Sequence, residues 1–151
     1  MLSLSATTGY TIKALGCLGT REREPRHIDE IARCTGVPRP YLAKIIGRLS
    51  RAGLVATKRG YRGGVSLQCD PQDIPLLQVV EAVEGPEWLS KCLLGMEACD
   101  VLKHCPTRKF WARFRREVTN ELRRTTMASV LSLGRSVGKR CLPVSVKTSN
   151  K

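Results

Sequence analysis

Three cysteines lie close together in the second half of the chain, at Cys92, Cys99 and Cys105. The stretch between them contains Gly95 and shows no strong helical pattern, so we expect a loop. We refer to residues 92–105 as the cysteine segment. Thiolates bind soft metals and iron–sulfur clusters, and thiols are also readily oxidised. The spacing alone is compatible with a metal site, with disulfide chemistry or with no function.

The chain has seven cysteines, and their meaning depends on the compartment. No apolar run reaches the length of about eighteen residues that a membrane span needs. The first residues lack the charged region and cleavage site of a signal peptide. These features predict a cytoplasmic protein whose thiols stay reduced. Of the remaining cysteines, Cys17 is expected in the core, and Cys34, Cys69 and Cys141 have no expected chemistry.

The net charge of +13 suggests a polyanionic partner, and its distribution is more informative than its total. No Asp or Glu occurs between Glu30 and Asp70. Eight basic residues lie in that interval: Arg33, Arg39, Lys44, Arg48, Arg51, Lys58, Arg59 and Arg62. Acidic residues predominate from Asp70 to Asp100. The basic region is therefore local, and on its own it fits either a nucleic-acid-binding surface or a solvated face.

Three short helices are predicted around this basic region. Apolar residues recur at helical spacing in residues 5–20, 27–34 and 38–52. Ser5 is a suitable N-cap for the first helix, and Gly36 separates the second helix from the third. In the third helix, one side carries Leu42, Ile45, Ile46 and Leu49, and the opposite side carries Tyr41, Lys44, Arg48 and Arg51.

Two β-prone runs, 54–58 and 65–68, follow the third helix and enclose a glycine-rich turn. The turn carries Arg59 and Arg62. Helix, turn, helix and hairpin in this order predict a winged helix-turn-helix, in which the second helix of the motif enters the major groove and the hairpin, or wing, contacts the backbone or minor groove. The acid-free basic surface favours this motif over an ordinary helical hairpin.

The rest of the chain is predicted to form a helix at 75–84, the cysteine segment and a long helix at 107–124. One side of the long helix carries Phe110, Trp111, Phe114, Val118 and Leu122, a stripe that we expect to pair with a second copy of the chain. The predicted fold is mainly α with a small β-hairpin wing. Its regions are a winged helix-turn-helix DNA-binding domain at 1–84, a cysteine cluster-binding loop at 85–106, a dimerisation helix region at 107–133 and a flexible basic tail at 134–151.

These motifs, in this order and at these spacings, resemble the Rrf2 family of bacterial transcription regulators over residues 2–133. The matching stretches are Thr8-Gly9-Tyr10 to Leu15 in the first helix, IARCTGVPRPYLAKIIGRLSRAGLV, RGYRGGVSL, LLQVVEAVEGP and the three-cysteine segment followed by Cys105 and Pro106. The resemblance implies a homodimer that binds a double-stranded DNA operator and is held together by its long C-terminal helix. It also implies an iron–sulfur cluster, of the [2Fe–2S] or [4Fe–4S] type, whose state alters operator binding. The expected function is therefore a regulator, acting as a repressor, that senses nitric oxide, redox state or iron–sulfur supply.

Specific residues can be matched to the family. Cys92, Cys99 and Cys105 match the cluster ligands. The residues expected to contact DNA are Arg39, Pro40, Tyr41, Lys44, Arg48 and Arg51 in the helix, and Arg59 and Arg62 in the wing. By residue type, Arg39 and Lys44 suit guanine edges or phosphates, and Arg48, Arg51 and Arg62 suit phosphates.

The chain departs from the family at the fourth cluster ligand. Some members use a histidine three residues after the last cysteine, and this chain has Arg108 at that position. Others use an acid or a histidine from the first helix of the partner subunit, and this chain has Gly9 at the acidic position. His104, Glu97, Asp100, water or a small thiol are the remaining candidates. An iron with a weak fourth ligand should be displaced easily, which suits the sensing of a small molecule.

Three other functions share part of the pattern. A regulator without a cluster would use the three thiols as a thiol/disulfide switch. An iron–sulfur electron carrier would leave the basic region and the wing without a purpose, and its fourth cysteine is missing. A structural zinc site normally uses a closer cysteine spacing. Catalysis is not expected, because His27 and His104 lack a nucleophile and an orienting acid at recognisable spacing.

Overall fold

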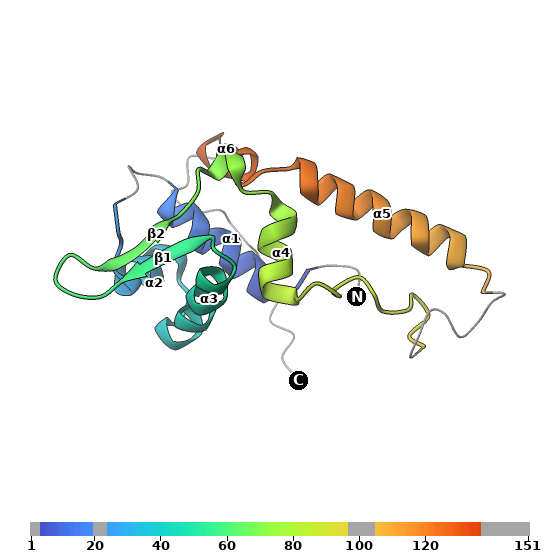
Figure 1. Ribbon diagram of the computed structural model, residues 1–151, viewed down its shortest axis with the longest axis horizontal. Coiled ribbons are helices and arrows are strands. Elements are labelled where there is room, and N and C mark those ends of the chain that lie inside the picture. Colours follow the sequence, from blue (N-terminus) through green and yellow to red (C-terminus); the bar gives the residue numbers. More distant parts are fainter. Residues whose placement is uncertain (1–3, 20–23, 97–104, 137–151) are drawn as a thin grey trace.

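A computed structural model of the chain describes residues 4–19, 24–96 and 105–136 (Figure 1). The elements are α1 (Ala6–Leu18), α2 (Ile28–Thr35), α3 (Arg39–Arg51), β1 (Val55–Lys58), β2 (Gly64–Leu67), the 3-10 helix η1 (Pro71–Asp73), α4 (Leu76–Glu84), α5 (Arg108–Arg124) and α6 (Met127–Ser136). The order α1, α2, α3 and hairpin confirms the predicted winged helix-turn-helix. The predicted flexible tail at 134–151 begins too early, because residues 134–136 belong to α6. The rest of that tail and Cys99 lie outside the described residues.

Local sequence signals set the helix ends. The Ser5 side chain accepts a hydrogen bond from the Thr8 amide and so caps α1. Acidic residues in the first turn of α2 suit the helix dipole. Gly36 then ends α2 with φ of 70°, a left-handed conformation that glycine adopts without steric cost. Pro40 lies in the first turn of α3, where its missing N–H is tolerated.

The wing is a two-stranded antiparallel sheet in which Val55 pairs with Leu67 and Lys58 pairs with Gly64. The chain just before α2 lies against its second strand, because the Arg26 amide donates to the Val65 carbonyl at 2.9 Å and the Val65 amide donates to the Arg26 carbonyl at 2.8 Å. A Cβ atom at Gly64 would lie 2.7 Å from the Arg26 carbonyl oxygen. Glycine is therefore required where the wing meets this segment.

One hydrophobic core joins the helices and the wing. Its fully buried side chains include Leu15 of α1, Ile31 of α2, Leu42 and Leu49 of α3, and Val79 of α4. The buried face of α3 is the apolar face predicted from its periodicity. This packing leaves the opposite, basic face of α3 in solvent.

The helix α6 returns the chain to this core after α5. The Leu76 amide donates to the Thr125 carbonyl at 2.8 Å, and the Met127 amide donates to the Ile74 carbonyl at 2.8 Å. Met127 is 1% exposed and Leu131 is 8% exposed. The sequence pattern alone predicts one region at 107–133 and does not separate α6 from α5.

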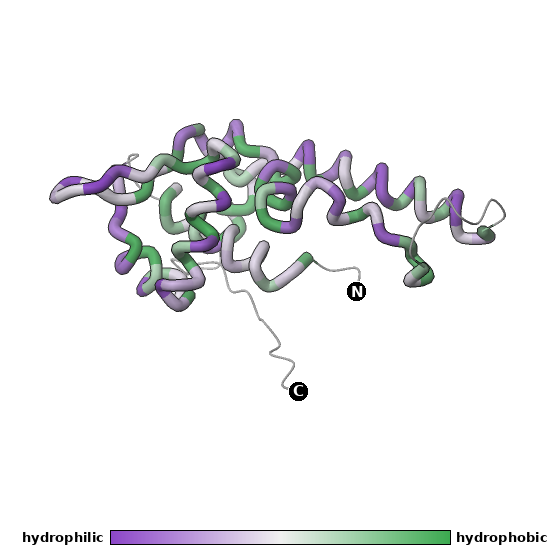
Figure 2. Tube along the Cα trace, turned by 60° about the horizontal axis from the view of Figure 1, so that its bottom comes forward, coloured by the Kyte–Doolittle hydropathy of each residue, from purple (hydrophilic) through white to green (hydrophobic). Residues whose placement is uncertain are grey.

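By contrast, α5 extends away from α1, α2, α3 and the wing (Figure 1). Trp111 is its only buried side chain among the described residues, and Phe110 is 53% exposed. Figure 2 shows hydrophilic and hydrophobic residues alternating along α5 with the period of a helix. Within one chain the predicted apolar stripe is therefore partly covered: Phe110 is exposed, and Phe114, Val118 and Leu122 are half-buried. None of the described helices is long and apolar enough to cross a membrane.

Cys17 and Cys34 form a disulfide bond between α1 and the last turn of α2, with their Cα atoms 6.6 Å apart. The prediction that the thiols stay reduced is wrong for this pair. Helical periodicity correctly predicts that Cys17 is buried. It cannot show that the end of α2 packs beside Cys17, because that contact depends on how the two helices cross.

We predict that Leu131→Ala lowers the free energy of unfolding by about 2–5 kcal/mol, because it removes a buried side chain from the core beside α1. Leu133→Ala is the matched control, because Leu133 is 62% exposed in the same helix. It should change the free energy by less than about 0.5 kcal/mol. Chemical denaturation of both variants measures the difference, and equal effects would show that α6 is not part of the core.

Candidate DNA-binding surface and cysteine segment

The basic face of α3 is exposed along its length. Arg39, Lys44, Arg48 and Arg51 are all exposed, whereas the apolar residues between them are buried. Arg39 forms an ion pair with Asp29 of α2 across 3.3 Å, and both side chains are more than half exposed. An exposed pair of this kind contributes little to stability, so Arg39 can exchange Asp29 for a DNA phosphate or base at low cost.

Tyr41 is held against α1 rather than pointing freely into solvent. Its hydroxyl forms a hydrogen bond with the Thr7 hydroxyl. Its ring packs edge-to-face on Tyr10, with the ring centroids 5.8 Å apart and an interplanar angle of 87°. Tyr41 is 36% exposed. These contacts fix the N-terminal end of α3, where side chains that reach into a major groove must be placed.

The wing tip presents two arginines on either side of an exposed aromatic ring. Arg59 and Arg62 are exposed, and Tyr61 between them is 97% exposed. The Gly63 amide donates to the Gly60 carbonyl at 2.8 Å and closes the turn. Tyr61 is absent from the sequence-predicted site, although an aromatic residue flanked by arginines in a glycine-rich turn is a signal that points to it.

Arg48 occupies a different place from the other basic residues of α3. Its guanidinium donates to the Val83 carbonyl at 3.0 Å, near the C-terminal end of α4. A cation at this position satisfies a carbonyl oxygen that has no partner within the helix. Arg48 therefore joins α3 to α4.

Glu84, the last residue of α4, accepts hydrogen bonds from the beginning of α1. Its carboxylate oxygen accepts from the Ser5 amide at 2.9 Å, and also from the Ser5 and Thr8 hydroxyls. Partial burial raises the pKa of Glu84, but these hydrogen bonds and the Arg48 charge outweigh it and lower the pKa below its ordinary value. Glu84 thus stays ionised and connects α1, α3 and α4 at one point.

The cysteine segment begins eight residues after Glu84, and its two ends are the parts that the structure describes. The Trp111 indole N–H donates to the Lys91 carbonyl at 3.0 Å, which attaches the residue before Cys92 to α5. Cys105 lies just before α5, and both cysteines are half-buried. The beginning and the end of the segment are therefore both attached to the N-terminal part of α5.

Cys105 interacts with the first residues leading into α5. Its Sγ lies 3.2 Å from the Thr107 hydroxyl. This hydrogen bond, backbone N–H groups and the charge of Arg108 lower the pKa of Cys105 below that of an ordinary thiol. Arg108 itself is exposed. Within residues 4–19, 24–96 and 105–136, no group of three or more metal-ligating side chains is found. Cys99 and three candidate fourth ligands, Glu97, Asp100 and His104, lie outside these ranges.

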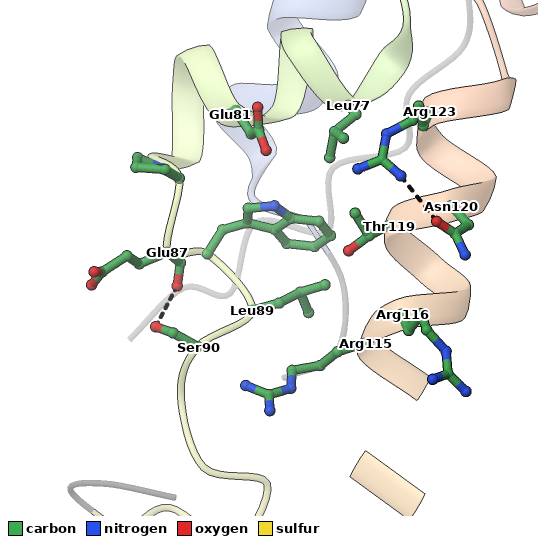
Figure 3. Close-up of a pocket in the computed structure, with 12 residues that line it drawn as sticks. Leu77, Glu81, Glu87, Leu89, Ser90, Arg115, Arg116, Thr119, Asn120 and Arg123 are labelled. Atoms are coloured by element: carbon green, nitrogen blue, oxygen red, sulfur yellow. Dashed lines mark hydrogen bonds between the residues drawn. The ribbon is translucent and has the colours of Figure 1, made fainter. Parts of the chain in front are cut away.

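A cavity of about 550 Å³ separates α4 from α5 beside residues 86–90. Figure 3 shows Glu81 and Leu77 of α4 on one side and Thr119 and Arg123 of α5 on the other. Charged groups of both signs line it. The cavity lies where α4, α5 and the residues leading to the cysteine segment meet.

The geometry described above has counterparts in known proteins. A family model described as Rrf2, iron-dependent transcriptional regulator, matches residues 4–132. A protein of Aquifex aeolicus (strain VF5) described as an HTH-type transcriptional regulator is 28% identical over 143 residues, which cover 93% of this chain and 97% of that protein. The HTH-type transcriptional regulator IscR of Aliivibrio salmonicida is 30% identical over 111 residues, which cover 73% of this chain and 66% of that protein. The solved structure of CymR, the global cysteine regulator of B. subtilis, superposes with a TM-score of 0.72 at 27% identity, covering 88% of this chain and 98% of that one.

Glu84 should make stability depend on pH. Folding lowers the pKa of Glu84 below its ordinary value of 4.5. The ionised carboxylate therefore stabilises the folded protein fully at pH values above 4.5, and this stabilisation is lost as the pH falls through the lower pKa of the folded state. At pH 7 we expect Glu84→Gln to lose about 1–2 kcal/mol relative to wild type, and the loss should shrink at pH 3. Glu81→Gln, an exposed change in the same helix, is the control. A loss that is the same at both pH values would contradict this role.

Proposed function

Because the chain belongs to the Rrf2 family of transcriptional regulators, we propose that it binds operator DNA through α3 and the wing and adjusts this binding through an iron–sulfur cluster on Cys92, Cys99 and Cys105. The family's members bind DNA and are not enzymes. The observation that carries the proposal is that both ends of the cysteine segment lie against the N-terminal part of α5.

For DNA, we assign α3 to the major groove and the wing tip to the backbone. The N-terminal end of α3 carries Arg39, Pro40, Tyr41 and Lys44 on an exposed surface next to the buried core. We assign base contacts to Arg39 and Lys44. We assign phosphate contacts to four arginines, Arg48, Arg51, Arg59 and Arg62. Tyr61 lies between the two wing arginines and would extend this backbone contact.

For the cluster, the donor set has the chemistry that iron requires. Two half-buried thiols at the ends of the segment are described, one of them with a lowered pKa, and a third lies between them in the sequence. Thiolates are the usual protein ligands of iron–sulfur clusters, and the family description names iron. A bound cluster would supply a centre that reacts with nitric oxide or oxidants or is lost when iron is scarce. Repression lifted by that change is the proposed mode of regulation.

The proposed route from the segment to DNA runs through Glu84. This residue ends α4, accepts hydrogen bonds from Ser5 and Thr8 of the α1 N-terminus, and lies near Arg48 of α3. A shift of residues 85–92 would displace the C-terminal end of α4, and Arg48 would move with it because it is hydrogen-bonded to Val83. Residues 86–90 line the cavity between α4 and α5, so part of this stretch borders open space.

We propose a homodimer that pairs through α5. The face that carries Phe110, Phe114, Val118 and Leu122 has no fully buried side chain, and a second α5 would remove it from water. Light scattering should give twice the chain mass of 16.7 kDa for wild type and about the single mass for Phe110→Glu. Lys109→Glu, an exposed neighbouring change, should stay dimeric. A dimeric Phe110→Glu protein would contradict this interface.

A thiol/disulfide switch in the same segment is the second candidate. It is favoured by the lowered pKa of Cys105, since the thiolate is the form that oxidants attack. Under this alternative, oxidation would change DNA binding in protein that contains no iron. Iron and sulfide analysis of anaerobically purified protein separates the two candidates.

We predict that anaerobically purified wild type contains iron and sulfide, and that Cys92→Ala, Cys99→Ala and Cys105→Ala each lower the iron content to near background because each removes a ligand. Cys69→Ala is the control, since Cys69 is an exposed cysteine after the wing. It should keep the wild-type content and visible absorption. Iron that is unchanged in the three variants would exclude the proposed ligands, and iron-free wild type would favour the thiol switch.

Arg62→Ala should weaken binding to every duplex alike, because a phosphate contact carries no sequence information. The slope of log affinity against log salt should become shallower by about one. Arg124→Ala, on α5, is the matched control and should leave the slope unchanged. Fluorescence anisotropy with two unrelated duplexes over a salt series measures both effects. An unchanged slope for Arg62→Ala would remove the wing tip from the interface.

A further inference from the structure

The disulfide between Cys17 and Cys34 lies outside the cysteine segment and is not used in the function proposed above. It joins α1 to α2, the first helix of the helix-turn-helix, and closes a loop with a sequence separation of 17 residues. We propose that Cys17 and Cys34 form a second oxidisable site, which takes a hydroperoxide as oxidant and fixes the helix-turn-helix against α1 when oxidised.

The two sulfur atoms have different environments. Cys17 is 1% exposed and packs in the core, whereas Cys34 is half-buried in the last turn of α2. An oxidant can therefore reach Cys34 more easily than Cys17. Cys34 is the attacking thiolate in this scheme, and Cys17 is the resolving thiol.

The chemistry is complete with one hydroperoxide. The Cys34 thiolate attacks a peroxide oxygen, the O–O bond breaks, and a sulfenic acid and one water or alcohol result. The Cys17 sulfur then attacks the Cys34 sulfur, the S–O bond breaks, and a second water leaves as the S–S bond forms. Two thiols lose two electrons, which the peroxide accepts.

The rate of the first step is limited by the position of Cys34. The C-terminal end of a helix carries partial negative charge, which disfavours a thiolate there. We therefore expect this site to respond to sustained oxidising conditions rather than to a brief pulse.

The bond acts where α2 supports the DNA-reading helix. Beyond Cys34, the Thr35 hydroxyl donates to the Ile31 carbonyl at 2.7 Å and accepts from the Val37 amide at 3.2 Å, and these contacts shape the turn into α3. On the other side, Tyr10 of α1 packs on Tyr41 of α3. Fixing α1 to α2 therefore fixes both supports of α3. The DNA-binding arrangement described above contains the bond, so the oxidised protein keeps its affinity for DNA.

The test uses the full-length chain in wild-type form and with Cys92→Ala, Cys99→Ala and Cys105→Ala combined. Each protein is reduced, then held in hydrogen peroxide, and its remaining thiols are alkylated before peptide mass spectrometry. We expect a linked peptide pair that contains Cys17 and Cys34 in both proteins. If the cluster proposal were wrong, the purified protein would lack iron. The peptide measurement does not depend on iron, so it tests the Cys17–Cys34 proposal separately.

Thermal unfolding provides the second readout. Closing a loop of this length should raise the Tm of the triple variant by roughly 6–12 °C on oxidation. The rise should vanish when Cys34→Ala is added, and it should remain when Cys69→Ala is added instead. Each comparison is made between the oxidised and reduced forms of the same variant. The difference in Tm is therefore informative even for a variant whose overall stability is lower.

Three results would overturn the proposal. The first is recovery of Cys17 and Cys34 as alkylated thiols after oxidation, or linked to other cysteines. The second is a Tm that does not depend on redox state. The third is loss of affinity for a 30-base-pair duplex when the Cys17–Cys34 bond forms, which would contradict the role of the bond in holding α1 and α2 in the DNA-binding arrangement.

Discussion

The carboxylate of Glu84 is the interaction on which the arrangement of the DNA-binding surface depends. It accepts hydrogen bonds from the first turn of α1, and its negative charge lies near Arg48 of α3. Arg48 also donates to the Val83 carbonyl. Three helices that are distant in sequence therefore meet at one charged group. The hydrogen bonds and the Arg48 charge favour the ionised carboxylate, so they help to hold the three helices together at this point.

Both flanks of the stretch between Glu84 and Thr125 are bound to the core. At its start, Glu84 is bound to α1. At its end, backbone hydrogen bonds join residues 125 and 127 to residues 76 and 74, and α6 then packs into the core. The cysteine segment and α5 lie between these points. Both ends of α4 are therefore bound through contacts at the flanks of this stretch, and the proposed sensing uses these attachments.

Short-range patterns predicted the fold well, and long-range contacts account for what they missed. Gly36 and the apolar residues of α3 act within a few residues, so they predicted the helix-turn-helix and its exposed basic face. The contacts of Glu84 with Ser5 span 79 residues, and no local pattern contains them. The Cys17–Cys34 bond and the docking of α6 depend on helix crossings in the same way. The roles assigned to the DNA-contacting residues and to the three cysteines remain predictions.

The proposed coupling is tested most directly by comparing the DNA affinity of iron-loaded and iron-stripped protein. The DNA is the duplex that binds the protein most tightly in a selection from fragments of its own genome. Both forms are prepared anaerobically from one batch and measured at one salt concentration. If the cysteine segment is coupled to the DNA-binding surface, the two affinities should differ by about tenfold or more, as expected for an allosteric coupling. Equal affinities, in protein shown to gain and lose its iron, would contradict the coupling.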